Sequence, residues 1–310
     1  MFDKTKVINW IEEYLFYPKT FIQFLLSFLL LPLSFIYCLI VISKRVFSQK
    51  QKFSIPIISI GNLTVGGSGK TPLTTELARE YENCAIILRG YKRTSTGLIV
   101  VSHDKKILCG VDTSGDEAMM YALSLPNATV IVSEDRIEGI KKAESLNCKI
   151  VFLDDGFSKS FIQKFDILIK PKDEPTLPFC LPSGAYREPK YLYKSADFVA
   201  IEDIDFTRKI TIKNQTKEMI LVTGISKPKR LDRYLPKNLI KKIYFEDHHL
   251  YTKKELENLM KRYKATSIIT TEKDAVKMRD FGLNLSIMEL KIEIKKELKD
   301  KINTFLANFR

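Results

Sequence analysis

The chain has 310 residues, 45% of them hydrophobic and 28% charged, which is enough apolar material for a large buried core. Fifty lysines and arginines against 37 acidic residues give a net charge of +13, which favours an anionic partner such as an anionic membrane or a phosphorylated substrate. The basic residues are spread along the chain and no nucleic-acid-binding module is recognisable, so we expect no nucleic acid partner. The five cysteines are odd in number and widely spaced, as is typical of a reduced, cytosolic protein without disulfides or structural zinc.

The first feature along the chain is an apolar segment of 22 residues without a formal charge, Phe21–Ile42. As one helix it would be about 33 Å long, against a hydrocarbon core of roughly 30 Å. Pro32 lies within the segment and could kink or split the helix, so a membrane span and a hairpin in one leaflet both stay open, as does a buried helix of a soluble core. The aromatic stretch before it suits an interface, and the basic residues after it predict that this end faces the cytoplasm: Lys44, Arg45, Lys50 and Lys52.

A glycine-rich motif, Thr-Val-Gly-Gly-Ser-Gly-Lys-Thr, follows at residues 64–71, directly after an apolar run that predicts a buried strand. Its glycines can take backbone angles that let successive N–H groups converge on phosphate oxygens. Lys70 would reach the β- and γ-phosphates and the Thr71 hydroxyl would bind Mg²⁺, although the usual pattern has glycine in place of Thr64. The motif therefore predicts a nucleoside triphosphate site made by Thr64, Val65, Gly66, Gly67, Ser68, Gly69, Lys70 and Thr71.

Beyond this motif, apolar runs typical of strands alternate with helical patterns. Strands are predicted at 56–61, 84–88, 98–101, 128–133, 149–153 and 165–169, and helices at 72–82, 115–124 and 136–146. A second alternation begins after about residue 205, with strands at 218–223, 241–245, 266–270 and 285–290 and helices at 252–262, 273–280 and 293–308. The pattern predicts an α/β fold with a P-loop NTPase-like parallel sheet flanked by helices in 51–205, a second, smaller α/β domain in 206–310, and an N-terminal membrane-associated helical segment in 1–50.

Two acidic motifs lie where one element meets the next. Asp154 and Asp155 end the strand at 149–153, and an acid there, beside a P-loop strand, can be aimed at Mg²⁺, whereas alone it is more often a turn or a helix cap. Asp116 and Glu117 open the helix at 115–124. Because acids favour a first helical turn, capping is the favoured interpretation there from the residues alone.

Further motifs carry charges suited to phosphate chemistry. Arg89 and Tyr91 follow the strand at 84–88, where phosphate or ring contacts and a solvated turn are equally open, and Arg136 is a weaker case of the same kind. Arg187 and Glu188 lie in a proline-bounded loop. They are either a surface ion pair or an arginine that neutralises phosphoryl charge beside a carboxylate for Mg²⁺.

Two motifs in the last third of the chain are harder to interpret. Asp247, His248 and His249 make a poor zinc site because no third histidine or cysteine is near, and an acid–base or positioning role and a structural role both stay open. The stretch Thr271–Lys277 is predicted to begin a helix and superficially resembles a guanine-specificity motif, but its spacing is wrong, which argues weakly against a GTPase.

Taken together, these residues resemble the tetraacyldisaccharide 4'-kinase family, the lipid A 4'-kinases, in register from the N-terminal hydrophobic segment to at least residue 277. In one respect the chain departs from the family, which commonly has Gln-His where Ser158 and Lys159 stand, so no role is carried over there. The family form of the glycine-rich motif also accounts for Thr64. The motifs that carry the resemblance are Gly61-Asn62-Leu63-Thr64-Val65-Gly66-Gly67-Ser68-Gly69-Lys70-Thr71-Pro72, Arg89-Gly90-Tyr91, Gly115-Asp116-Glu117, Leu153-Asp154-Asp155-Gly156-Phe157, Arg187-Glu188-Pro189, Thr223-Gly224-Ile225, Asp247-His248-His249 and Thr271-Glu272-Lys273-Asp274-Ala275-Val276.

The resemblance implies an enzyme on the cytoplasmic face of the inner membrane that transfers the γ-phosphate of ATP to the 4'-hydroxyl of tetraacyldisaccharide 1-phosphate, giving lipid IVA. It implies ATP and Mg²⁺ as cofactors and this glycolipid and the inner membrane lipids as partners, and we infer no obligate protein partner. The residues that it implies are Asp116, His248, Lys70 and Arg187 for catalysis, Thr71, Asp154 and Glu188 for the metal, and Arg89, Tyr91, Glu117, Asp155 and Arg136 for the substrate.

Two other function classes stay open from the residues alone. One is a membrane-anchored P-loop ATPase that acts as a switch and has water as its only acceptor. The other is a P-loop carrier that binds a nucleotide without turnover. A kinase needs a base for its acceptor hydroxyl, for which Asp116 and His248 are candidates, whereas a switch needs only a positioned water.

Overall fold

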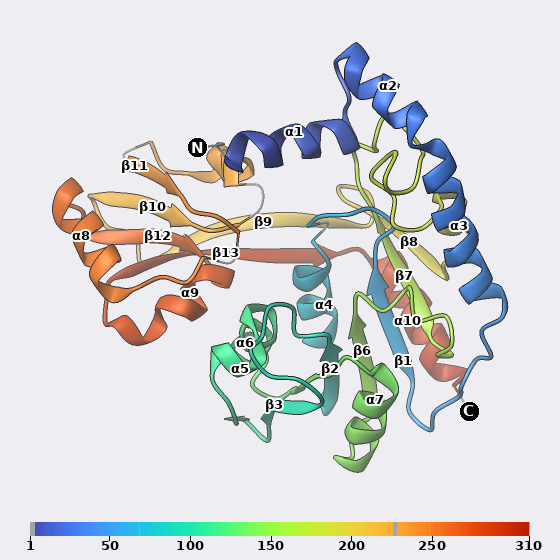
Figure 1. The fold of residues 1–310 in the computed structure, drawn as a ribbon. Helices are drawn as coiled ribbons and strands as arrows, with labels where there is room; N and C mark the ends of the chain where they lie inside the picture. The colour runs from blue at the N-terminus through green and yellow to red at the C-terminus, as the bar shows by residue number, and fades with distance from the viewer. Residues whose placement is uncertain (1–3, 68, 226–227, 238, 248, 310) are drawn as a thin grey trace. The chain divides into compact units, whose positions relative to one another are not determined.

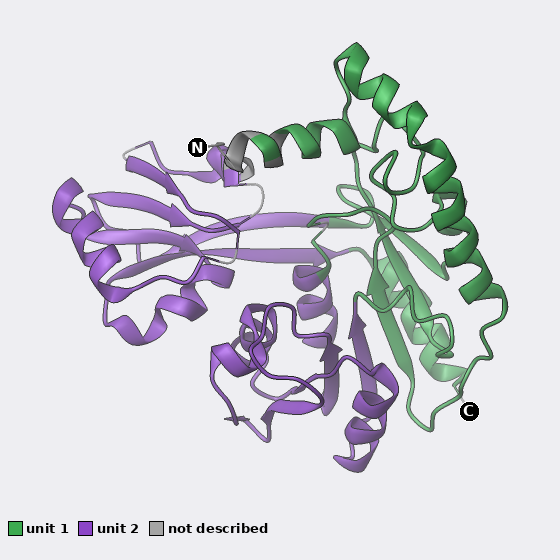
Figure 2. Cartoon of the chain, in the orientation of Figure 1, with its two compact units in different colours: residues 1–70, 155–206, 295–310 green, residues 71–154, 207–294 purple. Residues whose placement is uncertain are grey.

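The computed structural model describes residues 4–67, 69–225, 228–237, 239–247 and 249–309 (Figure 1). The chain forms two compact units, each assembled from separate stretches of sequence (Figure 2). Unit 1 comprises residues 1–70, 155–206 and 295–310, and unit 2 comprises 71–154 and 207–294. These units group the chain differently from the three predicted domains, and the domain boundaries stay a prediction.

Unit 1 contains three parallel strands. β1 (Ile57–Gly61) pairs with β7 (Phe165–Lys170), which pairs with β8 (Phe198–Ile201). Every residue of β1 is buried, which is why its sequence is an almost continuous apolar run. The C-terminal helix α10 (Lys296–Ala307) packs against β8, and the rings of Phe165 and Phe305 lie 5.2 Å apart.

The N-terminal apolar segment is not one helix but is split near Pro32, one of the options left open by the sequence, and its membrane role stays a prediction. It forms α2 (Phe21–Leu29) and α3 (Leu31–Val46), which are bent by 50°. Pro32 explains the break, because it lies in the first turn of α3, where a missing N–H is tolerated. Within the described residues no single helix is long and apolar enough to cross a bilayer, and α2 and α3 meet that test only as a bent pair. A further helix, α1 (Lys4–Phe16), precedes them.

Polar side chains on one face of helix α3 form hydrogen bonds with the loop at 180–188. The Ser34 hydroxyl donates to the carbonyl of Cys180 at 2.9 Å, and the Tyr37 hydroxyl donates to the carbonyl of Arg187 at 2.8 Å. Apolar side chains of α3 are exposed instead: Phe35 is 65% exposed and Leu39 is 47% exposed. The apolar character of this segment is therefore not explained by burial in unit 1.

The glycine-rich motif is followed by α4 (Lys70–Ala78), and the first sheet of unit 2 comes after it in the chain. Strands β2 (Cys84–Leu88), β5 (Thr129–Val132) and β6 (Ile150–Asp154) are parallel, with β2 in the middle. Strands β3 (Ile99–His103) and β4 (Lys106–Ile107) extend the sheet antiparallel beyond β5. Helices α5 (Val111–Ser114), α6 (Asp116–Ser124) and α7 (Arg136–Ser145) complete this part.

The second sheet has the strand order β11-β10-β12-β13-β9. Its strands are β9 (Phe206–Lys213), β10 (Met219–Thr223), β11 (Leu239–Tyr244), β12 (Ser267–Thr271) and β13 (Leu285–Ile294), and β10 to β13 are parallel. Alternate residues of β10 enter different core clusters, Met219 and Leu221 on one side and Ile220 and Val222 on the other. Helices α8 (Lys253–Tyr263) and α9 (Glu272–Met278) cover the second cluster through Leu256 and Met278.

The predicted strands and helices of both alternations are present within a few residues of their expected bounds. The α/β class and the mainly parallel sheets are thus confirmed. The prediction missed β4, β8 and β9. β4 has only two residues, and most of β9 alternates partly buried with exposed positions, so neither carries the apolar run by which the other strands were recognised. β8 does carry a short apolar run, Phe198–Ile201, which the prediction left out.

Candidate active site

The glycine-rich loop of unit 1 has the backbone geometry that a phosphate-binding loop requires. Gly66 and Gly69 both have φ of +87°, a conformation that favours glycine. The loop is held from the side by the segment at 185–187, because the N–H of Val65 donates to the carbonyl of Ala185 at 2.8 Å. Thr64 is buried and forms a β-bridge with Tyr186. Its place in that bridge gives a structural reason for threonine where glycine is usual, since its backbone is extended rather than turned.

Two cations meet at one amide beside this loop. The Lys70 ammonium and the Arg187 guanidinium each donate to the Oδ1 atom of Asn62 at 2.9 Å. Arg187 also forms a bidentate pair with Asp155, with both distances 2.9 Å, and this hydrogen bonding raises the pKa of Arg187. Lys70 lies 3.7 Å from the same carboxylate. One carboxylate and one amide therefore hold two cations, and this local excess of positive charge suits a phosphate ligand.

Glu188, the neighbour of Arg187, is paired with the N-terminal helix. Arg45 of α3 lies 2.9 Å from its carboxylate, and the Arg45 guanidinium stacks 4.0 Å above the Phe157 ring. Burial raises the pKa of Glu188, and the positive charges of Arg45 and Arg187 oppose that rise. The carboxylate predicted to bind metal is thus buried and paired with Arg45, with the charge of Arg187 nearby.

In unit 2, two of the predicted metal ligands lie together. The Thr71 hydroxyl lies 3.5 Å from Asp154, whose carboxylate also accepts a hydrogen bond from Tyr121 at 2.8 Å. Tyr121 is fully buried, and burial raises its pKa well above the usual value, so it stays a neutral donor. An alcohol and a carboxylate are the oxygen ligands that Mg²⁺ prefers, so the donor set fits that ion. Among the described residues, no three His, Cys, Asp or Glu side chains cluster in a way that could hold a metal on their own.

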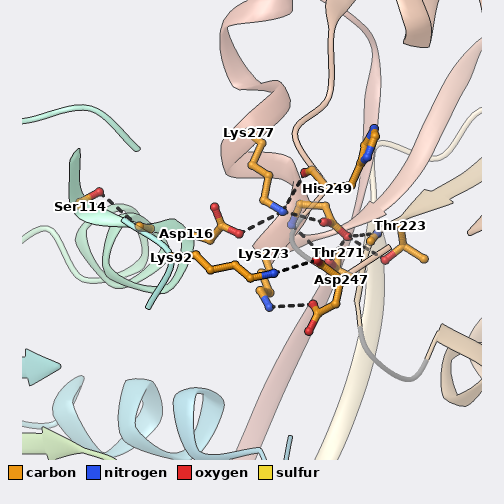
Figure 3. Close-up of polar contacts among 12 residues, drawn as sticks. Lys92, Ser114, Asp116, Thr223, Asp247, His249, Thr271, Lys273 and Lys277 are labelled. Atoms are coloured by element: carbon orange, nitrogen blue, oxygen red, sulfur yellow. Dashed lines mark hydrogen bonds and ion pairs between the residues drawn. The ribbon is translucent and has the colours of Figure 1, made fainter. Parts of the chain in front are cut away.

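The carboxylate of Asp116 lies at the start of α6, where Gly115 has φ of +84°. A side chain on Gly115 would approach the carbonyl of Tyr91 to 3.1 Å, so this glycine lets the motif after β2 pack beside the start of α6. Asp116 forms an ion pair of 3.0 Å with Lys277 of α9 (Figure 3). Asp116 and Glu117 thus lie in the first turn of α6, as the capping interpretation expected, and Asp116 in addition pairs with α9.

Four motifs of unit 2 converge at this point (Figure 3). Lys92, from the segment after β2, donates to the carbonyl of Asp247 at 3.3 Å, and Lys273 of α9 lies 3.3 Å from the Asp247 carboxylate. Lys277 also donates to the carbonyl of His249. The His249 ring itself points elsewhere, stacking on Phe245 and lying 3.1 Å from Glu255. The contacts of His249 are those of a structural residue.

The remaining predicted residues have varied surroundings. Arg89 is exposed, Tyr91 is 62% exposed and Glu117 is partly buried. Arg136 is 3% exposed and donates to the carbonyl of Ser133 within its own turn. Ser68 and His248 lie outside the described residues. The roles given to all of these residues stay predictions.

Four residues that the structure places in these clusters were given no site role from the sequence: Asn62, Arg45, Asp274 and Lys277. Asn62 stands inside the glycine-rich motif, so its position was a usable signal. Arg45 was interpreted only by its charge at the end of an apolar segment. Lys277 and Asp274 come together with Asp116 through tertiary packing of α9 on α6, for which local sequence carries no signal.

A buried strand, a loop turned by two glycines, a lysine at its end and a helix after it define a P-loop nucleotide-binding protein. The comparisons with known proteins specify which kind. The sequence matches the family described as tetraacyldisaccharide-1-P 4'-kinase over residues 26–216 and 206–308. The chain belongs to this family and is therefore a kinase.

Relatives and a solved structure agree with that assignment. The tetraacyldisaccharide 4'-kinase of Aliarcobacter butzleri is 56% identical over 99% of this chain and all of its own length. That of Helicobacter pylori is 49% identical over 96% of this chain and 95% of its own. A crystal structure of LpxK from Aquifex aeolicus in complex with ATP has a TM-score of 0.75 and 27% identity, and the match covers 91% of this chain and 99% of that one.

Proposed function

We propose that the enzyme transfers the γ-phosphoryl group of ATP to the 4'-hydroxyl of tetraacyldisaccharide 1-phosphate, and that the product is lipid IVA. The names of its relatives support this acceptor, and the ATP complex of the Aquifex aeolicus protein supports the donor. The observation that carries the proposal is the pair of cations, Lys70 and Arg187, that share the Asn62 amide at the end of a glycine-turned loop. This is a site for a polyphosphate rather than for a neutral ligand.

The transfer forms one bond and breaks one. The 4'-oxygen of the sugar attacks the γ-phosphorus, the bond from that phosphorus to the bridging oxygen breaks, and its electron pair leaves with ADP. The proton of the hydroxyl passes to the Asp116 carboxylate, which opens α6. Lys70 and Arg187 turn from Asp155 to the phosphate oxygens and stabilise the charge that they carry in the transition state.

Thr71, Asp154 and Glu188 are the residues that we assign to Mg²⁺. Two of them, Thr71 and Asp154, already lie 3.5 Å apart in unit 2. When bound, the ion neutralises charge on the β- and γ-phosphates. His248 is assigned to the support of Asp116, and Arg89, Tyr91, Glu117, Asp155 and Arg136 to the substrate, on the resemblance of their motifs to those of the family.

We place the enzyme at the cytoplasmic face of the inner membrane. The acceptor is a lipid, and α1 to α3 leave large apolar side chains on the surface, which is typical of a surface that meets lipid. The net charge of +13 suits an anionic leaflet and an anionic glycolipid. The most exposed of these side chains are Phe21, Ile22, Leu29, Phe35 and Val46, and Phe47 directly after α3 is exposed as well.

The direct test is an incubation of the full chain with γ-labelled ATP, Mg²⁺ and the glycolipid in mixed micelles. Label that appears in the lipid fraction supports the proposal. Label that appears only as inorganic phosphate, at a rate that does not depend on the lipid, supports a P-loop ATPase switch. No release of label at all supports a nucleotide carrier. Asp116→Asn, which keeps the size of the side chain, should stop transfer to lipid while the protein still binds ATP.

A further inference from the structure

We propose that Lys277 is a positioning residue for Asp116. It holds the carboxylate of the proton acceptor in one orientation and keeps it ionised. The inference rests on the proposed function, because it gives a role to a residue that acts through Asp116. It goes beyond that function because Lys277 belongs to none of the catalytic, metal or substrate sets assigned above.

The first argument is the geometry of the ammonium group. The Lys277 side chain is only 3% exposed, and its nitrogen lies 3.0 Å from Asp116, 3.4 Å from Asp274 and 3.3 Å from the carbonyl of His249 (Figure 3). The ring of Tyr251 lies on another side, 5.6 Å from the nitrogen. A buried ammonium is costly unless anions and acceptors surround it, so these contacts fix the lysine in place.

The second argument is that Asp274 has a structural role of its own. Its carboxylate is fully buried and accepts hydrogen bonds from the Thr223 hydroxyl at 2.7 Å, the Gly224 N–H at 3.0 Å and the Thr271 hydroxyl at 3.0 Å. Asp274 therefore anchors α9 to the end of β10 through Oδ2, and only its Oδ1 atom faces Lys277, at 3.4 Å. The shorter ion pair of the lysine is the one to Asp116.

The third argument concerns charge. One ammonium lies between two carboxylates, so the cluster as a whole keeps a negative charge. Asp274 is wholly enclosed, whereas the Asp116 side chain is 12% exposed, so Asp116 is the carboxylate that a substrate hydroxyl can reach. A positive neighbour favours the ionised form of a carboxyl group, and only the ionised form can accept a proton. Lys277 therefore gives Asp116 the two properties that a base needs, a fixed position and an ionised carboxylate.

The groups that face Asp116 come from three elements. Lys277 and Asp274 belong to α9, Tyr251 to the segment before α8, and Glu117 follows Asp116 in α6. Burial raises the pKa of Tyr251, so this phenol stays neutral and does not compete with Lys277 for Asp116. Lys277 is the cation that pairs with Asp116, whereas Lys92 and Lys273 of the same cluster contact Asp247, so removal of Lys277 lowers the positive charge felt by Asp116.

The experiment compares Lys277→Met and Lys277→Arg with the wild type in the glycolipid assay as a function of pH. Lys261→Met, an exposed lysine near the end of α8, is the matched control. We expect Lys277→Met to lower kcat on the order of 10²-fold, because the base loses its orientation, while the KM for ATP changes less than about threefold. In the pH profile of kcat for Lys277→Met, the acidic limb should move to higher pH, because the Asp116 carboxylate loses the positive neighbour that favours its ionised form.

Lys277→Arg keeps the charge but not the geometry. It should keep the acidic limb of the wild type and show a kcat between those of the wild type and Lys277→Met. If Lys277→Met does not fold, as judged by thermal melting, Lys277→Arg alone decides, since a kcat equal to that of the wild type would overturn the positioning role. An unchanged kcat and pH profile in folded Lys277→Met would overturn it as well. A wild-type enzyme that labels no lipid would instead refute the proposed function.

Discussion

At the scale of single residues, the site of unit 1 depends on shared partners. Asn62 accepts hydrogen bonds from Lys70 and Arg187 through one oxygen, and its amide nitrogen donates to the carbonyl of Thr64 at 2.8 Å. The same side chain therefore orients both cations and closes the start of the phosphate-binding loop. Groups that share partners in this way respond to substitution as a unit.

Asn62→Ala should lower kcat/KM for ATP at least about tenfold, because two cations and the loop lose their common partner, and a lost hydrogen bond to a charged group costs about 1.5–3 kcal/mol. Asn62→Asp is the matched variant. It keeps an acceptor of the same shape, so it should position Lys70 and Arg187 better than alanine does. Its negative charge should also hold both cations more tightly and hinder their movement to the phosphate. Steady-state kinetics with varied ATP would check both. An alanine variant with unchanged kcat/KM would show that the amide has no part in the site.

At the scale of elements, helix α3 is both an apolar surface element and a support for the site. Ser34, Tyr37 and Arg45 reach the segment at 180–188 from one face, while Phe35 and Leu39 point outward. The position of Glu188 is therefore tied to the helix by the Arg45 ion pair. Deleting the N-terminal residues would remove this support along with the apolar surface.

Arg45→Ala should lower both stability and activity. The Glu188 carboxylate would stay buried after losing its 2.9 Å partner, and the stacking on Phe157 would be lost. We expect a loss of about 1–3 kcal/mol in the free energy of unfolding, less than for a fully buried pair because Arg45 is partly exposed. Lys44→Ala is the matched control, since the neighbouring side chain is exposed. Equal melting temperatures and turnover in the two variants would contradict the support role of α3.

The same elements show what could and could not be read from the sequence. The strand before the glycine-rich motif and the acidic end of β6 were predictable, because apolar runs and motif spacing are local properties. The sequence allowed a break near Pro32 but did not require it, since a proline fits both a kinked helix and the first turn of a new helix. The pairing of Asp116 with Lys277 could not be predicted, because it arises from the packing of α9 on α6.

At the scale of the whole molecule, the protein has both a large positive net charge and an exposed apolar surface. We propose that the net charge of +13 attracts the protein to an anionic bilayer and that the exposed side chains of α2 and α3 supply the apolar contact. Two weak signals of this kind are enough for stable association with a membrane. Either signal alone should bind reversibly and in a salt-dependent way.

Phe35→Asp with Leu39→Asp tests the apolar signal without touching the polar face of α3. The two side chains lie one turn apart and are both exposed, so the fold should persist. Each buried apolar side chain is worth about 1.5–3 kcal/mol, so the partition of the protein into anionic vesicles should fall at least about tenfold. Sedimentation with the vesicles, with ATP binding as the control for folding, would measure this. Unchanged partition would show that this surface does not meet lipid.

The most direct test of the central claim, that the phosphate-binding loop delivers a phosphoryl group to a glycolipid, is the rate of label transfer from ATP to lipid by Lys70→Ala. Lys141→Ala, an exposed lysine of α7, is the matched control. The account predicts a fall on the order of 10³-fold for Lys70→Ala in a protein that still folds, because a charge that stabilises the transition state is removed. It predicts no change for Lys141→Ala. Near-normal transfer to lipid by folded Lys70→Ala would contradict the account.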